Sequence, residues 1–205
     1  AYYGNDLRTL VCPLPVNEAP GKNWEYLSAN TQLLSIVLRE STGKSLAQLT
    51  ELWLWQPLGA RHQAKWSLDK PDGMAKAYCC FNATALDFAR IGDLILHNGI
   101  VAGDTLISPG FMKKATTPAT DLLGPDNTPV DFYGYQWWLA EIKGYRCIYA
   151  RGILGQYIAV VPELDLILVR LGHKRSKEKV NQHPVDFIQY MEFSISLFQD
   201  EKGST

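Results

Sequence analysis

The sequence lacks the features that would assign it to several large classes of protein. Its longest apolar runs fall far short of the roughly 20 residues that a membrane-spanning helix needs. It contains no His-x-x-x-His, no Cys-x-x-Cys and no glycine-rich phosphate-binding loop. A metal enzyme or a nucleotide-binding protein would therefore have no visible basis. From these absences we predict no membrane span, no cofactor and no metal.

The chain also has no large excess of either positive or negative charge. Lysine and arginine number 20 against 21 acidic residues, for a formal net charge of -1. The one basic cluster, "HKRSKEK" at 173–179, is short and is interrupted by Glu178. A solvated loop is a better interpretation of this cluster than a nucleic-acid-binding patch. The predicted partner is thus a small-molecule or peptide-like substrate rather than nucleic acid.

Cysteine and histidine are scarce, with four residues of each. The cysteines show no metal-binding spacing, and Cys79 and Cys80 are adjacent, which is poor geometry for bridging each other. We interpret all four as small buried thiols. The histidines are far apart in sequence, so we interpret them as surface residues.

What is present is enough apolar sequence, 46% of 205 residues, to bury the core of one large domain or two small ones. A helix is predicted to start at Ser28 or Asn30, with Leu33, Ile36 and Val37 on one face, and Gly43 ends it. Ser45 opens the next helix with a capping box to Gln48.

Further helices are predicted from Asn82 as an N-cap to Gly99, and after Ser108-Pro109. The composition then changes to segments that are rich in aromatic and β-branched residues and are separated by turn signals. These segments are "YGYQWWLAEI", "YRCIYARGI", "QYIAVVP" and "LDLILVRLG". We predict three or four antiparallel strands there, followed by an amphipathic helix after Pro184. The fold class is α+β, with a mainly helical region at 1–118 and a sheet region at 119–205.

Acyl-transfer chemistry is compatible with these residues. It needs a nucleophile, a base and N–H donors for the oxyanion, and a Ser-x-x-Lys pair on one helical turn is one solution. The chain contains three such strings, at 41–44, 67–70 and 176–179. The first spans Gly43, the second enters a Pro-Asp-Gly turn and the third lies in the most polar segment. A hydrolase that uses Ser67 and Lys70 is the least favoured hypothesis.

Several strings together carry a resemblance. They are "APGKNWEYLSANTQLLSIVLRESTGKSLAQL", "WQPLGA", "WSLD", "NATALDFARIGDLIL", "YGYQWW" and "ARGILGQYIAVVPELDLILVRLG". In this order they resemble serine hydrolases of the class C β-lactamase and penicillin-binding-protein superfamily, and most of all its esterase and 6-aminohexanoate-dimer hydrolase branch. The likeness covers nearly the whole chain. It implies a β-lactamase-like fold, in which an antiparallel sheet is flanked by helices next to a helical region.

The resemblance implies a role for Tyr26 as the tyrosine of the Tyr-x-Asn element, which passes a proton between the serine and the leaving group. Ser28 takes the position of that asparagine, and Asn30 is displaced from it by two residues. Neither inherits the asparagine's role directly. Both are expected to line the site or to cap the helix.

"ARGI" at 150–153 falls where the β-lactamases carry Lys-Thr-Gly. The resemblance makes the Ile153 N–H one oxyanion donor and Gly152 a position where a side chain would block the substrate. Ala150 replaces the lysine and Arg151 replaces the threonine, which argues against the carboxylate recognition of β-lactam substrates. An ester or amide substrate fits better.

Tyr133 and Trp137 are expected to wall the substrate pocket, together with Trp138. Aromatic residues in a strand are more often part of the core, and this alternative remains open.

In this superfamily Ser-x-x-Lys precedes the tyrosine, but the 25 residues before Tyr26 contain no serine. We therefore expect an N-terminally truncated C-terminal portion of a serine hydrolase, inactive by itself. The alternative is a non-catalytic, degenerate module that binds a cell-wall or peptide ligand. An incomplete sheet would favour a dimer or association with the missing N-terminal segment. The resemblance weakly favours a periplasmic or exported protein.

Overall fold

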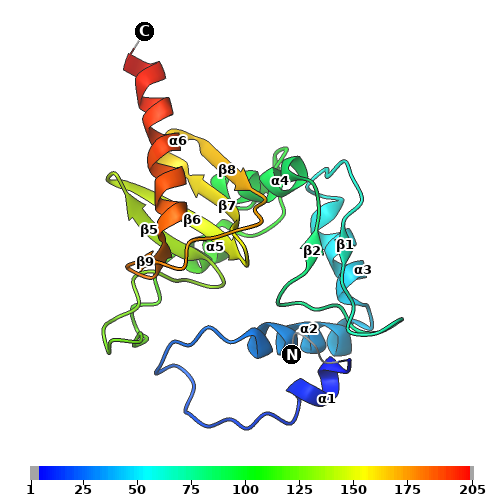
Figure 1. The fold of residues 1–205 in the computed structure, drawn as a ribbon. Coiled ribbons are helices and arrows are strands. Elements are labelled where there is room, and N and C mark those ends of the chain that lie inside the picture. Colours follow the sequence, from blue (N-terminus) through cyan, green and yellow to red (C-terminus); the bar gives the residue numbers. More distant parts are fainter. Residues whose placement is uncertain (1–4, 204–205) are drawn as a thin grey trace. The chain divides into compact units, whose positions relative to one another are not determined.

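A computed structural model describes residues 5–203, and the chain divides into two compact units (Figure 1). The first unit comprises Ala1–Thr84 and Asp121–Thr128, and the second comprises Ala85–Thr120 and Pro129–Thr205. Each unit is described by itself below.

The first unit combines one helix of 15 residues and several shorter ones with two short strands. Its elements are α1 (Leu7–Val11), α2 (Ser28–Thr42), α3 (Leu46–Thr50), the π-helix η1 (Glu51–Trp55), β1 (Lys65–Trp66) and β2 (Phe81–Asn82). The two strands pair antiparallel, with Trp66 opposite Phe81.

Local capping chemistry explains where these helices begin and end. Gly43 ends α2 with a left-handed φ of 68°, and its N–H donates to the Arg39 carbonyl. Ser45 opens α3 with the predicted capping box, because its side chain accepts from the Gln48 N–H while the Gln48 side chain accepts from the Ser45 N–H. These predictions are confirmed.

The buried face of α2 differs from the predicted one. The helix buries Gln32, Ser35 and Ile36, whereas Leu33 and Val37 are exposed. The Gln32 amide explains the difference, since it donates to the Ala75 carbonyl at 3.1 Å and accepts from the Ala77 N–H at 2.9 Å. These polar contacts, more than the burial of its leucines, therefore decide which face of α2 is buried.

The interpretation of all four cysteines as buried thiols is wrong. Cys79 and Cys80 form a disulfide with each other, and Cys80 has a left-handed φ of 67°. Cys12 is a free exposed thiol and Cys147 a free buried one. An unusual backbone conformation at Cys80 thus accompanies the bridge that ordinary geometry argued against.

The second unit contains the predicted antiparallel sheet. Its strands are β5 (Trp138–Ile142), β6 (Tyr145–Gly152), β7 (Gln156–Val161) and β8 (Leu166–Arg170), each paired with the next along the chain. The other elements are α4 (Ala85–Leu96), β3 (Ile100–Val101), β4 (Asp104–Thr105), α5 (Pro109–Ala115), the 3-10 helix η2 (Pro162–Leu164), β9 (Lys179–Val180), β10 (His183–Pro184) and α6 (Val185–Gly203). The α+β class is confirmed.

Helices cover both faces of this sheet. On one face α6 packs through Phe187, whose ring stacks on Tyr149 of β6 at 3.8 Å between centroids. On the other face α4 approaches so closely that a Cβ on Gly92 would lie 2.6 Å from the Ile167 side chain of β8. The core on this face contains Ile95, Met112, Leu139, Ile148 and Val160. The sheet is therefore the middle layer of three.

Two boundaries differ from the predicted ones. Asn82 does not cap α4 but ends β2, and its side-chain amide donates to the Cys80 carbonyl at 3.0 Å. The sheet-containing unit begins at residue 85 rather than near 119, because α4 and α5 pack against the sheet. Ser108 caps α5 as predicted, accepting from the Phe111 N–H.

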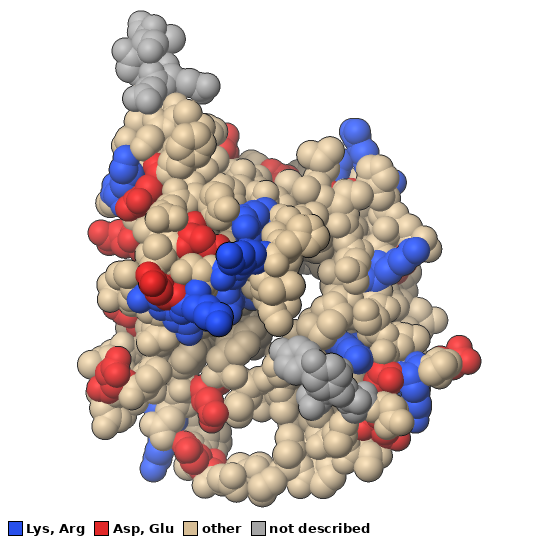
Figure 2. All heavy atoms as spheres, viewed as in Figure 1, with Lys and Arg blue, Asp and Glu red and all other residues tan. Residues whose placement is uncertain are grey.

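Lysines and arginines are interspersed with acidic residues over the face drawn in Figure 2. Within residues 5–203, no helix is both long and apolar enough to cross a bilayer.

Candidate active-site residues

Tyr26 lies in the first unit, in the extended segment directly before α2. Its side chain is 51% exposed. Leu27, in the N-cap position of α2, has an extended backbone and no side-chain cap. Tyr26 thus lies directly before the start of a helix and is half-exposed.

Ser28 and Asn30 occupy the first turn of α2. Ser28 is half-buried and Asn30 is exposed. The Asn30 N–H donates to the Leu27 carbonyl at 3.2 Å, which closes the first turn. Both side chains therefore follow Tyr26 on a regular helical start.

Gly152 and Ile153 lie in the second unit, where β6 turns into β7. Gly152 is the last residue of β6 and pairs with Gln156 across the hairpin. A Cβ on Gly152 would lie 2.8 Å from the Gln156 Cβ, so glycine is needed for the strands to approach. The Ile153 side chain is 67% exposed. Leu154 and Gly155 complete the turn with positive φ values of 60° and 81°.

Arg170, a residue that sequence reasoning missed, holds this turn. Its guanidinium donates to the Gly155 carbonyl at 2.6 Å and to the Lys174 carbonyl at 3.1 Å, and it lies 4.8 Å from the centroid of the Tyr190 ring. The Gln156 side chain adds two hydrogen bonds to the backbone of Gly172. The turn that carries Ile153 is therefore fixed from two sides.

Arg151 contacts an aromatic ring and a backbone carbonyl of the second unit. Its guanidinium carbon lies 3.3 Å from the centroid of the Trp138 ring, a cation–π geometry. Its Nη1 donates to the Gln182 carbonyl at 2.8 Å. Arg151 thereby links β6 to the turn between β9 and β10.

Tyr133 and Trp137 lie in or against the core of the second unit. Tyr133 is buried and meets Trp138 edge to face, with centroids 5.0 Å apart. Trp137 is half-buried and packs against the core cluster on the α4 face. Both side chains therefore contribute packing in this structure.

Tyr149 and His183 form a buried polar pair that was not predicted. The Tyr149 hydroxyl and His183 Nδ1 share a hydrogen bond of 2.8 Å. Burial, followed by the nearby charge of Arg151, lowers the pKa of His183 to about 4. Burial also raises the pKa of Tyr149. The interpretation of every histidine as a surface residue is wrong for His183, because strand pairing in β10 brings it inside.

The three Ser-x-x-Lys strings do not form one-turn helical pairs. Ser41 and Lys44 are separated by the left-handed Gly43. Lys70 follows β1 in a turn, and its Nζ lies 3.3 Å from Asp6. Ser176 lies in the loop before β9, and its N–H donates to the Asp186 carboxylate on α6.

In the part of the chain that the structure describes, no group of three or more His, Cys, Asp or Glu side chains is placed to hold a metal ion.

Comparison with known proteins gives consistent matches. A family model described as Beta-lactamase matches residues 1–189. The 6-aminohexanoate-dimer hydrolase of Paenarthrobacter ureafaciens is 28% identical over 154 residues, which cover 73% of this chain and 39% of that protein.

Solved structures are similar over almost the whole chain. A protein from Bacillus anthracis named as a candidate 6-aminohexanoate-dimer hydrolase superposes with a TM-score of 0.78 at 22% identity, covering 96% of this chain and 49% of that one. An octameric penicillin-binding-protein homologue from Pyrococcus abyssi superposes with a TM-score of 0.68 at 16% identity, covering 94% and 48%. The chain thus spans half or less of the length of these relatives, and the resemblance drawn from the sequence is confirmed.

Proposed function

Because the chain belongs to the beta-lactamase family, we propose that it carries the proton-transfer tyrosine and the oxyanion-binding strand of a serine hydrolase. The substrate is an ester or an amide. The name of the Paenarthrobacter relative, a 6-aminohexanoate-dimer hydrolase, supports an amide. The loss of the lysine at Ala150 supports a substrate other than a β-lactam.

The proposed reaction uses a serine and a lysine from sequence that precedes Tyr26 in the whole protein. The serine oxygen adds to the substrate carbonyl carbon, and Lys and Tyr26 relay its proton to the leaving amine or alkoxide. The carbonyl oxygen becomes an oxyanion, held by the N–H groups of Ile153 and of the serine. Water then cleaves the acyl-enzyme and releases the acid.

The observation that carries the proposal is the placement of Tyr26. It lies directly before a regular helix and is 51% exposed, so a substrate can reach the residue. The fixed turn at 153–155 supports the role of Ile153, since an oxyanion donor is effective only when it is held in place before the reaction.

The pocket-lining roles of Ser28, Asn30, Arg151, Gly152, Tyr133 and Trp137 stay predictions. For Tyr133, which is buried, and Trp137, which packs half-buried against the core, the packing alternative is favoured.

The test is acylation by a fluorophosphonate of the protein encoded by the complete in-frame gene. We expect Tyr26→Phe to slow acylation by about 10²–10⁴-fold, the usual contribution of a positioned proton-transfer group. Tyr135→Phe is a matched control, since Tyr135 is 56% exposed and Tyr26 is 51% exposed. Undiminished acylation of Tyr26→Phe would remove the assigned role. A gene product with no Ser-x-x-Lys segment before Tyr26 and no labelling would favour the non-catalytic binding module.

We also propose that the chain associates with a second copy or with N-terminal sequence of its own protein. Leu34 and Val37 on α2 are 56% and 61% exposed, which leaves an apolar stripe on this helix. Light scattering of the isolated chain should give a mass above 23.0 kDa. A stable monomer that stays soluble at high concentration would contradict this expectation.

A further inference from the structure

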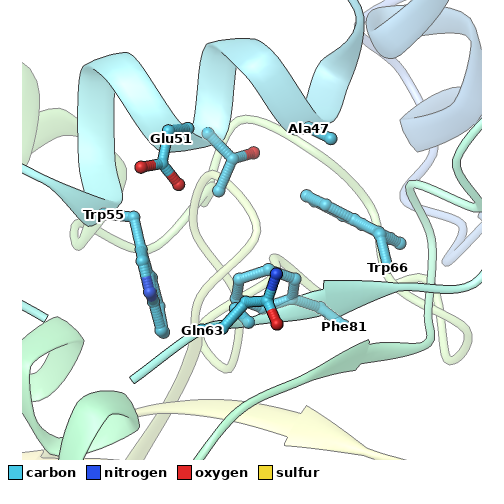
Figure 3. A pocket seen from close by; sticks show the side chains of 8 residues that line it. Ala47, Glu51, Trp55, Gln63, Trp66 and Phe81 are labelled. Atoms are coloured by element: carbon cyan, nitrogen blue, oxygen red, sulfur yellow. The ribbon is translucent and has the colours of Figure 1, made fainter. Parts of the chain in front are cut away.

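The first unit contains a pocket that the proposed hydrolase reaction does not use. Its volume is about 140 Å³. Figure 3 shows Trp55 and Trp66 at its two ends, Ala47 and Glu51 on the helical side, and Gln63 and Phe81 on the opposite side. Three large aromatic rings thus surround a space that they do not fill.

Backbone contacts fix the two indole rings. Trp55 Nε1 donates to the His62 carbonyl at 2.9 Å. Trp66 Nε1 donates to the carbonyls of Lys76 at 2.9 Å and Cys79 at 3.0 Å. Because both indole N–H groups have backbone partners, the rings offer the pocket their carbon surfaces.

Phe81 lies between the two indoles and completes the aromatic wall. Its ring meets Trp55 at a centroid distance of 5.2 Å and an interplanar angle of 86°, and Trp66 at 4.7 Å and 46°. Trp55 is buried, whereas Trp66 and Phe81 are only half-buried. The wall is therefore buried at Trp55 and partly open to solvent at Trp66 and Phe81.

Glu51 is the one ionisable side chain among the eight residues that line this pocket. It begins the π-helix η1, which ends at Trp55, so a single turn presents both the carboxylate and an indole. Its Oε1 accepts from Gln56 Nε2 at 2.9 Å, which restrains the carboxylate. Irregular π-helical turns are frequent at functional sites.

Aromatic faces attract cations, tryptophan most strongly, and a nearby carboxylate adds to that attraction. A cavity of about 150 Å³ takes a benzene-sized molecule, so this pocket suits a group of few heavy atoms. A single carboxylate is a poor ligand set for a metal ion, which prefers several oxygen or nitrogen donors.

We propose that this pocket binds a small alkylammonium cation, with the charged nitrogen among Trp55, Trp66 and Phe81 and with Glu51 as its counter-charge. The cation is either a free metabolite or the end group of a larger molecule. Its binding does not depend on the hydrolase reaction.

The test compares choline with 3,3-dimethylbutan-1-ol, a neutral molecule of the same shape, by calorimetric titration of the chain. Choline should bind about tenfold more tightly, because only the cation gains from the rings and the carboxylate. Equal affinities of the two probes would overturn the proposal. So would the absence of saturable choline binding at concentrations up to about 100 mM.

Glu51→Gln separates the cation site from a general apolar pocket. This substitution, at an exposed position, should weaken choline binding by about fivefold and leave the affinity for 3,3-dimethylbutan-1-ol unchanged. Glu141→Gln, an exposed glutamate on β5 of the other unit, removes the same charge and should leave choline binding unchanged. Circular dichroism of both variants checks their fold, and equal choline affinity in Glu51→Gln and Glu141→Gln would refute the role of Glu51.

Discussion

The segment 65–82 of the first unit and the sheet of the second unit are held together in different ways. The sheet is a continuous ladder of four strands over buried rings, so many residues share its stabilisation. The segment 65–82 has two strands of two residues each, and turns with a few backbone and side-chain hydrogen bonds order the chain between them. Gln32 holds residues 75–77, and Asp69 accepts from the backbone N–H groups of Leu7 and Met74. The stability of the segment 65–82 should therefore depend on single side chains, whereas the stability of the sheet should depend on buried volume.

The largest effect should come from removing buried volume beneath the sheet. Phe187 is fully buried, and its ring stacks on Tyr149. Phe187→Ala should lower the free energy of unfolding by about 3–5 kcal/mol, from lost burial and the cavity left behind. Urea unfolding followed by near-UV circular dichroism measures this. Phe193→Ala on the same helix is the control, since Phe193 is 65% exposed and should change stability by about 0.5 kcal/mol at most.

Acid should weaken the second unit through His183. The pKa of His183 is lowered to about 4 from an ordinary 6.5, so the unfolded chain binds the proton first. The contribution of neutral His183 to the free energy of unfolding is complete above pH 6.5 and is lost as the pH falls toward 4. The total loss is on the order of 3 kcal/mol.

The measurement is the free energy of unfolding at several pH values between 4 and 7. His183→Asn should remove this part of the pH dependence, whereas His173→Asn, at an exposed position, should keep it. An unchanged pH profile in His183→Asn would show that other groups cause the acid sensitivity.

A smaller effect should follow from a single polar change in the first unit. Gln32→Leu leaves the Ala75 carbonyl and the Ala77 N–H without their partner, at a cost of about 1–3 kcal/mol. Hydrogen exchange should show faster exchange of the Ala77 amide. The exposed Gln189→Leu substitution is the control. Retained protection of Ala77 in Gln32→Leu would mean that backbone packing alone orders this segment.

The smallest effect on overall stability should come from reducing the Cys79–Cys80 disulfide. The bridge closes a very short loop, so its chain-entropy contribution is about 1 kcal/mol. A thiol reagent should detect one thiol, Cys12, in the native protein and three after reduction. Cys147 should stay unreactive in the folded chain, because burial raises its pKa to about 12. Three reactive thiols before reduction would contradict the bridge.

Much of the fold could be read from local sequence signals. The capping box at Ser45 and Gln48, the helix stop at Gly43 and the strand texture after 132 each depend on neighbouring residues, and the structure contains all of them. The α4 start was misplaced, because Asn82 has the chemistry of an N-cap but is used in strand pairing. Local chemistry can say which residues suit a role but not which competing role they take.

The candidate site was less predictable than the fold. Motif order pointed to Tyr26 and to the Gly152–Ile153 turn, but no short-range signal linked Arg170 to the backbone of that turn. The same holds for the pairing of Tyr149 with His183, which are 34 residues apart in the chain. Such contacts need the sheet to form first.

By itself, the sequence determined the element types, the α+β class and the family likeness, since these follow from capping, periodicity and motif order. Only the tertiary structure decided which face of α2 is buried, which cysteines pair and which histidine is neutral inside the core. It also decided that Trp55, Trp66 and Phe81 surround a pocket beside Glu51. These outcomes depend on contacts between distant residues, which compete with local preferences and are settled only when the chain packs.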